Sequence, residues 1–443
     1  MALYGLLCAA VWLRERRRHR LAKAAAAQFA PSSGSAEAVL VAYASQTGSA
    51  EQWAWQTAQS LHTAGMPARV LALNEVDAAM LRATQRMLFI VSTYGEGDPP
   101  DSATLFAQRV MPWVPDLSTL HCGVLALGDS EYQHFCGFGR TLDAWLTERG
   151  AKPLFERIEV DRGNEDALRH WRHEVGRVAG TGDLPDWEGP RYQAWQLAAR
   201  RHLNPGSAGE PAYLVELRPP NDMPDAAWEA GDLVQVLAPA DAQRPREYSI
   251  ASLASDGRVQ LLVRQQRHAD GTLGVASGWL TRDAALHGAV DLRLRPHRAF
   301  RIEANRQRPL ILIGNGTGLA GLRSHLKARA VAKAGPNWLL FGERQAAHDL
   351  FFEDEIRAWR ADGTLARADF AFSRDQPERV YVQHRLMEAA ETVREWVAAG
   401  AAVYVCGSLE GMAAAVDAAL QEIVGVSALQ KLVEEGRYRR DVY

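Results

Sequence analysis

Residues 310–327, L-I-L-I-G-N-G-T-G-L-A-G-L-R-S-H-L-K, decide the fold of the last part of this chain. Four apolar residues lead into a loop with three glycines, and an amphipathic segment follows. This order is typical of a strand, a phosphate-binding loop and a helix, in which Gly314, Gly316 and Gly318 let the backbone approach a pyrophosphate. The stretch therefore predicts a dinucleotide site on an α/β sheet.

A second phosphate loop of a different kind lies near the start of the sequence. Residues 38–51, A-V-L-V-A-Y-A-S-Q-T-G-S-A-E, place hydroxyls and one glycine where the first loop has glycines. Such a loop suits a terminal monophosphate better than a bridging pyrophosphate. Two nucleotide sites of unlike chemistry in one chain suggest an electron relay.

Length and composition limit the classes of protein to consider. A chain of 443 residues is too long for one core, so two to four domains are expected. The net charge of −3 gives no reason to expect a nucleic acid partner. Four cysteines without a C-x-x-C pair support neither a disulfide framework nor a cysteine-ligated iron–sulfur cluster. Reduced thiols fit a cytoplasmic protein.

The N-terminus carries an apolar run that is shorter than a membrane span. Residues 1–13 are apolar and R-E-R-R-R-H-R follows, whereas a spanning helix needs about 20 apolar residues. Three interpretations remain: an interfacial anchor, the end of a transmembrane helix that begins upstream, or a short helix. Arginines after the run would keep the rest of the chain in the cytoplasm. We predict a cytoplasmic location, with residues 1–20 as a candidate tether to the cytoplasmic face of the inner membrane.

The pattern of apolar runs divides the remainder into three domains. After a linker at 21–37, five runs alternate with helical patterns in 38–178, which predicts a flavodoxin-like doubly wound parallel sheet. A second linker, 179–191, precedes short strands in 192–304 that predict an antiparallel barrel. Alternating strands and helices return in 305–443 and predict an α/β domain. The five runs are 38–44, 68–73, 86–92, 122–128 and 153–160.

Three loops of the first domain are expected to converge, because ligands of open α/β sheets bind at the carboxyl ends of the strands. Tyr94 and Tyr132 lie in the second and third of these loops and can stack on both sides of a flat ring. A phosphate loop with two stacking faces predicts flavin mononucleotide. Asp161, after the fifth run, is expected to pair with a polar group of the ring or ribitol.

Acidic residues gather in the same loops. They indicate either a rim that steers a basic electron acceptor or a merely solvated face. The residues are Glu96, Asp98, Asp101, Asp129 and Glu131.

The later domains carry further binding motifs. R-E-Y-S (246–249) offers an arginine for a pyrophosphate, a tyrosine for stacking on a flavin and a hydroxyl for its reactive nitrogen, and G-V-A-S (274–277) resembles a second phosphate-binding helix start. The stretch 371–383 contains a serine and two arginines, which suit the 2′-phosphate of NADP, although Asp375 could instead serve the ribose of NAD. Cys406 ends a strand and is either a small buried residue or a functional thiol. His170 and His173 on one helical face are interpreted as a solvated pair, so no metal site is predicted.

At these motifs the chain resembles the diflavin reductases, such as NADPH–cytochrome P450 reductase and the flavoprotein subunit of sulfite reductase. The resemblance covers about residues 38–443 and implies a ferredoxin-NADP-reductase-like FAD barrel and an NADP-binding domain after the flavodoxin-like domain. It implies FMN on Ser45, Gln46, Thr47, Gly48, Ser49, Ser92, Thr93, Tyr94, Gly95, Gly97, Leu127, Gly128, Asp129, Tyr132, Phe135 and Asp161.

The resemblance also implies the other two sites and the residues of hydride transfer. Ser249, Cys406 and Asp441 would serve hydride transfer, and Tyr443 would cover the FAD ring until nicotinamide replaces it. FAD would lie on Arg246, Tyr248, Ser249, Gly274, Val275, Ala276 and Ser277. NADPH would lie on Gly316, Thr317, Gly318, Ser373, Arg374, Arg379, Tyr381 and Gln383.

Two departures from the family pattern stand out. Only 13 residues (233–245) separate Asp232 from Arg246, where larger relatives insert a long helical connecting domain. The nucleotide loop has Asn315 where proline is usual, and Gly321 lies where the family has its A-P-F segment.

The implied activity is a reductase that passes electrons from NADPH to FAD, to FMN and to a one-electron acceptor at the acidic FMN domain. A haemoprotein is the expected acceptor, as in an NADPH–haemoprotein reductase. The alternatives are the haem subunit of sulfite reductase, and a ferric-siderophore or other membrane partner. A flavin-binding interaction protein without turnover is the hypothesis from another class.

Overall fold

The computed structural model describes residues 38–95, 97–114, 116–181, 184, 187, 191–221, 223 and 226–443. The chain divides into two compact units at residues 188 and 189. The predicted membrane segment at 1–20 and the linker at 21–37 lie outside the described residues, as does Glu96.

The first unit is a parallel α/β sheet with the strand order β2-β1-β3-β4, in which β5 and β6 both pair with β4. This confirms the predicted flavodoxin-like architecture. Its elements are β1 (Val39–Ala44), α2 (Ser49–Thr63), β2 (Ala68–Ala72), η1 (Leu73–Glu75), α3 (Ala78–Ala83), β3 (Arg86–Ser92), α4 (Asp101–Arg109), β4 (His121–Gly128), α5 (Gly137–Glu148), β5 (Lys152–Pro153), β6 (Ile158–Asp161) and α6 (Glu165–Val178).

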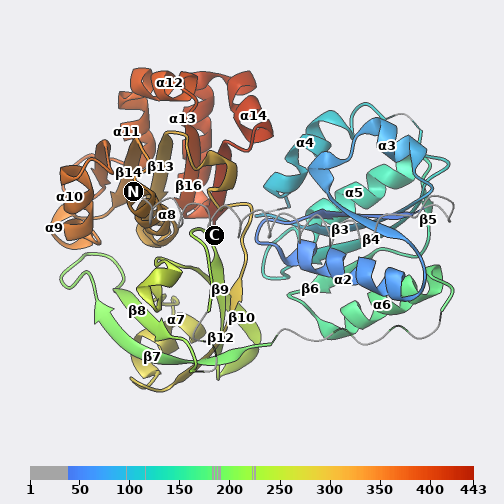
Figure 1. Cartoon of the computed structure of the whole chain (residues 1–443), viewed down its shortest axis with the longest axis horizontal. Coiled ribbons are helices and arrows are strands. Elements are labelled where there is room, and N and C mark those ends of the chain that lie inside the picture. Colours follow the sequence, from blue (N-terminus) through green and yellow to red (C-terminus); the bar gives the residue numbers. More distant parts are fainter. Residues whose placement is uncertain are drawn as a thin grey trace, which may run out of the picture. The chain divides into compact units, whose positions relative to one another are not determined.

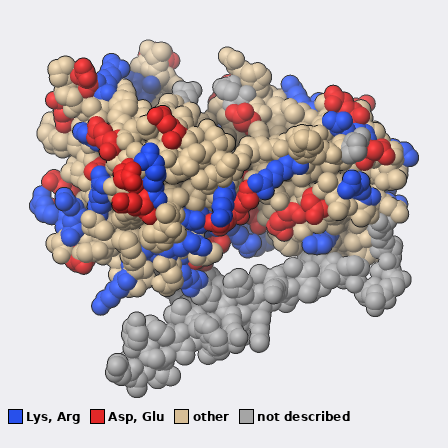
Figure 2. Space-filling view, turned by 90° about the horizontal axis from the view of Figure 1, so that it is seen from above, with Lys and Arg blue, Asp and Glu red and all other residues tan. Residues whose placement is uncertain are grey.

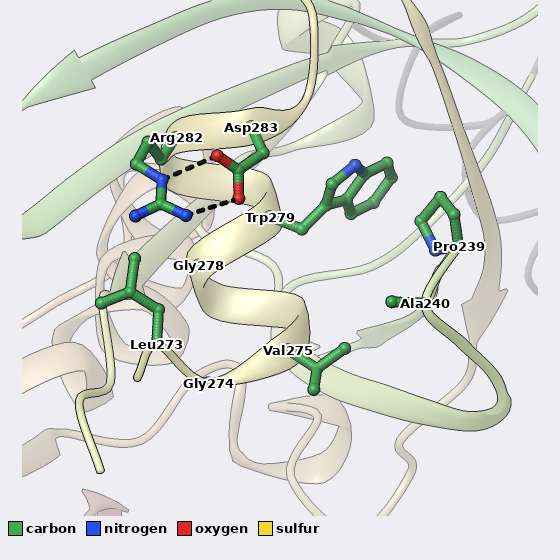
Figure 3. Close-up of a pocket in the computed structure, with 9 residues that line it drawn as sticks. All are labelled: Pro239, Ala240, Leu273, Gly274, Val275, Gly278, Trp279, Arg282 and Asp283. Atoms are coloured by element: carbon green, nitrogen blue, oxygen red, sulfur yellow. Dashed lines mark hydrogen bonds and ion pairs between the residues drawn. The ribbon is translucent and has the colours of Figure 1, made fainter. Parts of the chain in front are cut away.

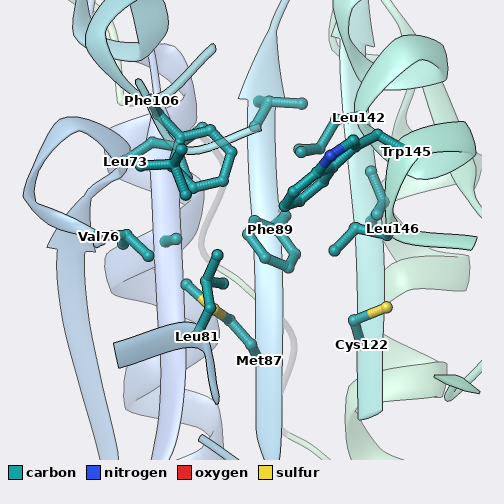
Figure 4. Packing of buried hydrophobic residues seen from close by; sticks show 14 of the residues in the cluster. Leu73, Val76, Leu81, Met87, Phe89, Phe106, Cys122, Leu142, Trp145 and Leu146 are labelled. Carbon is teal, nitrogen blue, oxygen red and sulfur yellow. The ribbon is translucent and has the colours of Figure 1, made fainter. Parts of the chain in front are cut away.

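Helices cover both faces of this sheet, and for that reason its central strands are apolar throughout. Helices α3, α4 and α5 pack on one face around Phe89, Phe106 and Trp145, while α2 and α6 pack on the other around Trp171 (Figures 1 and 4). The buried indoles keep hydrogen-bond partners: Trp145 Nε1 donates to the carbonyl of Met111 at 2.7 Å, and Trp171 Nε1 donates to Thr57 Oγ1 at 2.9 Å. Burial of these rings therefore leaves no unsatisfied N–H.

The prediction of one strand at 153–160 was wrong. Cys122 of β4 pairs with Pro153, and Leu125 pairs with Ile158, so two residues of β4 face four residues of the edge chain. The surplus residues leave the ladder. A Cβ at Gly123 would lie 2.4 Å from the ring of Phe155, so the excursion is held by a ring that packs over this glycine.

The second unit begins with an antiparallel six-stranded sheet of the order β10-β9-β12-β7-β8-β11. A bridge between Ile250 and Leu261 links the ends of that order, so the sheet curls into the predicted barrel. Its elements are β7 (Gln193–His202), β8 (Ala212–Arg218), β9 (Leu233–Ala238), β10 (Asp241–Ser249), η2 (Ala254–Asp256), β11 (Val259–Arg264), α7 (Val275–Gly278), η3 (Trp279–Asp283) and β12 (Ala289–Arg295).

The short segment at 233–245 forms a hairpin. Strands β9 and β10 are antiparallel neighbours, with Ala238 opposite Asp241 and Val236 opposite Arg246. The position where larger relatives carry a connecting domain is thus a tight turn in this chain.

A parallel sheet of the order β15-β14-β13-β16-β17 completes the second unit. Its elements are η4 (Glu303–Asn305), β13 (Leu310–Asn315), η5 (Gly316–Gly318), α8 (Leu319–Ala332), β14 (Asn337–Glu343), α9 (Ala346–Asp349), α10 (Glu353–Ala361), β15 (Arg367–Phe372), α11 (Val382–Glu388), α12 (Ala390–Ala398), β16 (Ala402–Gly407), η6 (Leu409–Ala413), α13 (Ala414–Val424), α14 (Val426–Glu434) and β17 (Tyr438–Val442). The strand, glycine loop and helix predicted for 310–327 are present as β13, η5 and α8.

Candidate functional site

The register of the C-terminal sheet brings the predicted hydride-transfer residues together. Cys406 pairs with Gly314 on one side and with Asp441 on the other, and Ser249 ends barrel strand β10. Ser249 Oγ donates to Asp441 Oδ2 at 2.8 Å, and Cys406 Sγ donates to the same oxygen at 3.7 Å. All three residues are buried. Residues that are distant in sequence thus form one hydrogen-bonded cluster.

The protonation state of Cys406 follows from its surroundings. Burial raises the pKa of the Cys406 thiol well above its usual value, and the nearby Asp441 carboxylate raises it further. A thiol with a raised pKa stays protonated at neutral pH, so Cys406 acts as a hydrogen-bond donor rather than as a nucleophile.

His297 is a neighbour of this cluster that the sequence analysis missed. Its Nδ1 lies 3.9 Å from Asp441 Oδ1, and its backbone N–H donates to Asp232 Oδ1 at 2.9 Å. His297 is almost fully buried, as is Asp232. It follows β12 in an irregular segment, where no spacing in the sequence marks it as part of a site.

The terminal residue, Tyr443, lies at the glycine loop. Its backbone N–H donates to the carbonyl of Gly407 at 3.0 Å, and its hydroxyl lies 3.1 Å from Thr317 Oγ1. The side chain is exposed. The tyrosine is therefore held through its hydroxyl by the loop that was predicted to bind the dinucleotide.

Glycine is required at the positions of this loop for different structural reasons. A Cβ at Gly318 would lie 2.1 Å from the carbonyl oxygen of Cys406, and one at Gly314 would lie 2.6 Å from the same atom. Both positions are thus required by packing against β16, whereas the sequence analysis had explained Gly314 by the approach of a pyrophosphate. Gly316 alone has a left-handed φ, +53°, and faces Arg264 and Glu343.

The residues predicted for the 2′-phosphate lie close together after β15. Arg374 Nη1 donates to the carbonyl and hydroxyl oxygens of Ser373, at 3.0 and 3.3 Å. Hydrogen bonds from Arg379 and then Arg374 lower the pKa of Tyr381, so both guanidinium groups lie at one phenol. Two cations around a tyrosine and a serine form a suitable site for a phosphate.

Gln383 and Asp375, two other residues of this stretch, also bear on the nucleotide site. The Oε1 atom of Gln383 is buried and has no hydrogen-bond partner in the described part of the chain, so a ligand group can satisfy it. Asp375, the candidate for an NAD ribose, instead accepts a hydrogen bond from the backbone of Ala346 at 2.9 Å.

A pocket of about 330 Å³ in the barrel is lined by two of the seven predicted FAD residues and by residues that were not predicted. In Figure 3, the side chain of Trp279 extends toward Pro239 and Ala240, and the Arg282–Asp283 ion pair lies at the side of the helix. Gly274 and Val275 line this pocket, while a Cβ at Gly274 would lie 2.8 Å from Ser277 Oγ. Backbone close to an open pocket fits the pyrophosphate-containing part of FAD.

Ser277 and the residues of the R-E-Y-S motif use some of their polar groups within the protein. The Ser277 hydroxyl accepts from the backbone N–H of Gln266 at 3.1 Å. Arg246 donates to the carbonyl of Arg244 at 2.7 Å, and burial raises the pKa of Tyr248. Ala276 is buried in α7.

The three loops of the first unit converge at the carboxyl ends of β1, β3 and β4, as predicted. The backbone N–H of Ser45 donates to Ser102 Oγ at 2.8 Å, and that of Thr93 donates to the carbonyl of Leu127 at 3.0 Å. A Cβ at Gly137 would lie 2.8 Å from Gly97 Cα. The loops after the three strands are thus in direct contact.

Hydroxyls of the first loop divide into two groups. Ser45 Oγ accepts from the backbone N–H groups of Gly48 and Ala50, at 2.8 and 3.2 Å, so it shapes the loop. Thr47 and Ser49 are half-buried and remain the candidates to meet a phosphate. Gln46 is buried and bonds to Asp101 through both ends of its amide.

The remaining predicted FMN residues line the other two loops. A Cβ at Gly128 would lie 2.8 Å from the backbone nitrogen of Cys136, so this glycine lets the third loop close. Tyr94 is half-buried and Tyr132 is 50% exposed, as expected of side chains that can receive a ring. Ser92, Gly95 and Phe135 are half-buried beside them.

The acidic rim contains a cation that the sequence analysis missed. Arg162 lies 3.7 Å from Asp129, 3.1 Å from Glu131 and 3.2 Å from Asp161. Asp161 also accepts from the backbone and hydroxyl of Ser130, at 3.0 and 2.7 Å. Its carboxylate, which was predicted to pair with a flavin, thus already organises the third loop.

In the described ranges, no group of three or more His, Cys, Asp or Glu residues could hold a metal ion, and His170 lies 3.7 Å from Glu174. In the same ranges, no single helix is long and apolar enough to cross a membrane, and one bent pair, Gly411–Val424 with Val426–Glu434, passes on length and composition.

Comparison with known proteins adds two family matches. The flavodoxin family matches residues 41–171, and the oxidoreductase NAD-binding domain family matches residues 312–418. Together with the barrel between them, these domains define an NADPH-dependent flavoprotein reductase that uses FMN, FAD and NADPH.

Similar proteins extend over almost the whole chain. Proteins named sulfite reductase [NADPH] flavoprotein alpha-component are 28% identical in Neisseria meningitidis serogroup B, a Shewanella species and Vibrio cholerae. The alignments cover 91%, 94% and 91% of this chain and 89%, 92% and 87% of those proteins. These matches support the diflavin reductase family that the sequence motifs indicated. The first alignment extends over 542 residues, more than the length of this chain, so the relative has segments that this chain lacks.

Proposed function

We propose that this diflavin reductase accepts hydride from NADPH beside Ser249 and delivers single electrons from its FMN unit to a haemoprotein of the sulfite reductase type. The observation that carries the proposal is the buried Ser249–Asp441–Cys406 cluster, which lies at the same sheet edge as the glycine loop. A hydride donor held on that loop would reach a flavin whose reactive edge meets Ser249.

The residues of the cluster would orient the reacting groups. Hydride transfer needs donor and acceptor atoms about 3–3.5 Å apart. Asp441 holds the Ser249 hydroxyl in one orientation, and the Cys406 thiol donates to the same carboxylate. Tyr443 is held at Thr317 and would have to move for nicotinamide to enter. Bound FAD would supply the conversion of a two-electron donor into single electrons.

The names of the relatives favour one acceptor over another. The sequence predicts a general NADPH–haemoprotein reductase, with a sulfite reductase flavoprotein as an alternative. The three similar proteins described above are named sulfite reductase flavoprotein alpha-component, so they support the second alternative better. A partner component that carries haem is therefore the proposed acceptor.

Charge at the FMN loops supports a positively charged docking face on that partner. Asp98 is exposed and Glu131 is 65% exposed, while Arg162 is the cation that pairs with the carboxylates of the third loop. On the face shown in Figure 2, acidic and basic side chains are interspersed. Such a rim would raise the association rate with a basic partner at low salt.

A reduction assay with the haemoprotein component of a bacterial sulfite reductase tests this proposal. Haem reduction by NADPH should require this chain, and its rate should fall as the ionic strength rises. Flavin reduction without electron transfer to that haemoprotein would contradict the proposed acceptor while leaving the reductase activity intact.

We further propose a cytoplasmic location with residues 1–20 as a membrane tether. The apolar run before a cluster of arginines supports this proposal. Cells that express the full chain are fractionated beside cells that express a chain beginning at residue 38. The full chain should be found in the membrane fraction, and the shortened chain should be found in the soluble fraction. Equal partitioning of both forms would contradict the tether.

A further inference from the structure

An ion pair lies against the second glycine of the nucleotide loop. A Cβ at Gly316 would lie 3.4 Å from Arg264 Nη2 and 3.5 Å from Glu343 Oε1. These two atoms form an ion pair with each other. A cation and an anion thus lie side by side at the glycine of the loop that is predicted to bind the pyrophosphate.

Both charged groups are built into the fold. Arg264 ends barrel strand β11, and its Nη1 also donates to the carbonyl of Glu210 at 3.1 Å. Glu343 ends β14, and its Oε2 accepts from the backbone N–H of Arg344 at 2.8 Å. The Glu343 side chain is only 6% exposed. The pair therefore joins the barrel to the nucleotide-binding sheet at the loop.

Glu343 also connects the two predicted phosphate sites. The carbonyl of Glu343 accepts from the backbone N–H of Ser373 at 2.9 Å, and the carbonyl of Arg344 accepts from the backbone N–H of Arg374 at 2.8 Å. The side chain thus faces the pyrophosphate loop, while the backbone supports the residues predicted for the 2′-phosphate.

The electrostatic environment of Arg264 favours a nearby anion. Burial lowers its pKa, and the nearby Arg344 lowers it further, while Asp349, Tyr443 and Glu210 act in the opposite direction. Arg264 is half-buried, and a half-buried guanidinium beside a glycine loop is a strong partner for phosphate oxygens. The carboxylate of Glu343, in contrast, would repel a pyrophosphate at the same place.

We propose that Glu343 is an internal anion that holds Arg264 until the pyrophosphate of NADPH replaces it, so that Glu343 weakens dinucleotide binding. The proposal rests on the nucleotide site at Gly316–Gly318. It predicts that Glu343 favours release of NADP⁺, because the carboxylate regains Arg264 when the pyrophosphate leaves. The backbone bond to Arg344 would keep the displaced carboxylate close by.

Calorimetric titration of the full flavin-loaded chain tests this role through binding rather than turnover. The ligands are NADP⁺, which cannot donate hydride, and 2′-AMP, which has the 2′-phosphate and lacks the pyrophosphate. Glu343→Gln should lower the Kd for NADP⁺ about tenfold and leave that for 2′-AMP unchanged, because only the pyrophosphate competes with the carboxylate. Arg264→Gln should raise the Kd for NADP⁺ about tenfold or more.

Two further variants make the test specific. In the Arg264→Gln background, Glu343→Gln should not increase the affinity for NADP⁺, because the carboxylate and the pyrophosphate no longer compete for Arg264. The double-mutant cycle measures this coupling. Glu391→Gln, which changes an 80% exposed carboxylate of α12, should bind both ligands like the unchanged chain. Unaltered binding of 2′-AMP also shows that each variant is folded.

Several results would overturn the proposal. It fails if Glu343→Gln binds NADP⁺ no more tightly than the unchanged chain, if 2′-AMP gains equally, or if the gain persists without Arg264. Binding of 2′-AMP and NADP⁺ by the unchanged chain would leave the nucleotide site standing in these cases. If the unchanged chain binds neither ligand, the site itself is wrong, and the role of Glu343 falls with it.

Discussion

The hydrogen bond between Ser249 and Asp441 allows a quantitative prediction about hydride transfer. Ser249→Ala removes the hydroxyl that donates to Asp441 Oδ2 at 2.8 Å in a buried environment. A hydrogen bond to a charged group contributes about 1.5–3 kcal/mol. If this orientation matters in the transition state, the loss corresponds to a rate decrease of about 10- to 150-fold, since 1.36 kcal/mol is tenfold.

Anaerobic stopped-flow mixing with NADPH measures that rate as the loss of flavin absorbance. The matched control is Ser255→Ala, because Ser255 is an exposed serine of the same barrel in η2. It should react like the unchanged chain. Binding of NADP⁺ should be similar in all three proteins, since Ser249 lies at the reacting end and not at the phosphates.

A normal rate of flavin reduction in Ser249→Ala would refute the role of the cluster. A slow rate with an equal loss of NADP⁺ affinity would also count against it, because that result indicates a distorted site. Asp441→Asn offers an independent check, since it removes the charge that Ser249 and Cys406 share. Its rate should fall by at least as much as that of Ser249→Ala.

Further predictions concern packing, specificity, the terminal ring and the thiols. Gly318→Ala should lower the free energy of unfolding by about 1–3 kcal/mol or more in thermal denaturation, because its Cβ would lie 2.1 Å from the carbonyl oxygen of Cys406. The control Gly335→Ala, whose Cβ would have its nearest neighbour at 3.8 Å, should have a small effect. Equal stability of the two variants would contradict this role of Gly318. Arg374→Gln and Arg379→Gln should each weaken NADP⁺ binding about tenfold and have little effect on NAD⁺ binding. The control Arg357→Gln, at a side chain that is 70% exposed, should change the binding of neither nucleotide. An equal loss of NAD⁺ affinity would argue against a 2′-phosphate site. Tyr443→Ala should bind NADP⁺ more tightly than the unchanged chain, because the ring no longer covers the site. Tyr443→Phe loses only the hydrogen bond to Thr317, so its affinity for NADP⁺ should lie between those of the unchanged chain and Tyr443→Ala. Weaker binding by both variants would contradict the covering role. Cys122, Cys136 and Cys406 should react slowly with maleimide in the native chain at pH 8, because burial raises the pKa values of their thiols, those of Cys122 and Cys136 to about 12. Mass spectrometry detects the label, and rapid labelling of any of the three would show that its thiol is accessible.

Much of the fold could be predicted because apolar runs and glycine loops are local signals. The stretch 310–327 has a buried strand, a left-handed glycine and a helix, each of which depends on neighbouring residues. The carboxyl ends of parallel strands meet at one edge, so topology alone predicted that the loops after β1, β3 and β4 would converge. The resemblance to the diflavin reductases implied that Ser249, Cys406 and Asp441 act together, and the structure brings them into one cluster.

What could not be predicted depends on contacts between distant segments. Arg264 and Glu343 end strands of two different sheets, and His297 lies in an irregular segment, so no spacing links them to the site. The role of Gly318 is set by the carbonyl of Cys406 on a neighbouring strand. Arg162 changes the charge of the third loop although it follows a different strand. These are tertiary contacts, and the sequence pattern carries no trace of them.

Anaerobic titration of the purified chain with NADPH is the most direct test of the central claim that one chain carries a two-flavin relay. Each bound flavin takes up two electrons, so flavin absorbance should bleach until about two equivalents of NADPH have been added per chain. Extraction of the same sample should yield FMN and FAD in equal amounts. Flavin absorbance that does not respond to NADPH, or bleaching that ends at about one equivalent with a single type of flavin, would contradict the account.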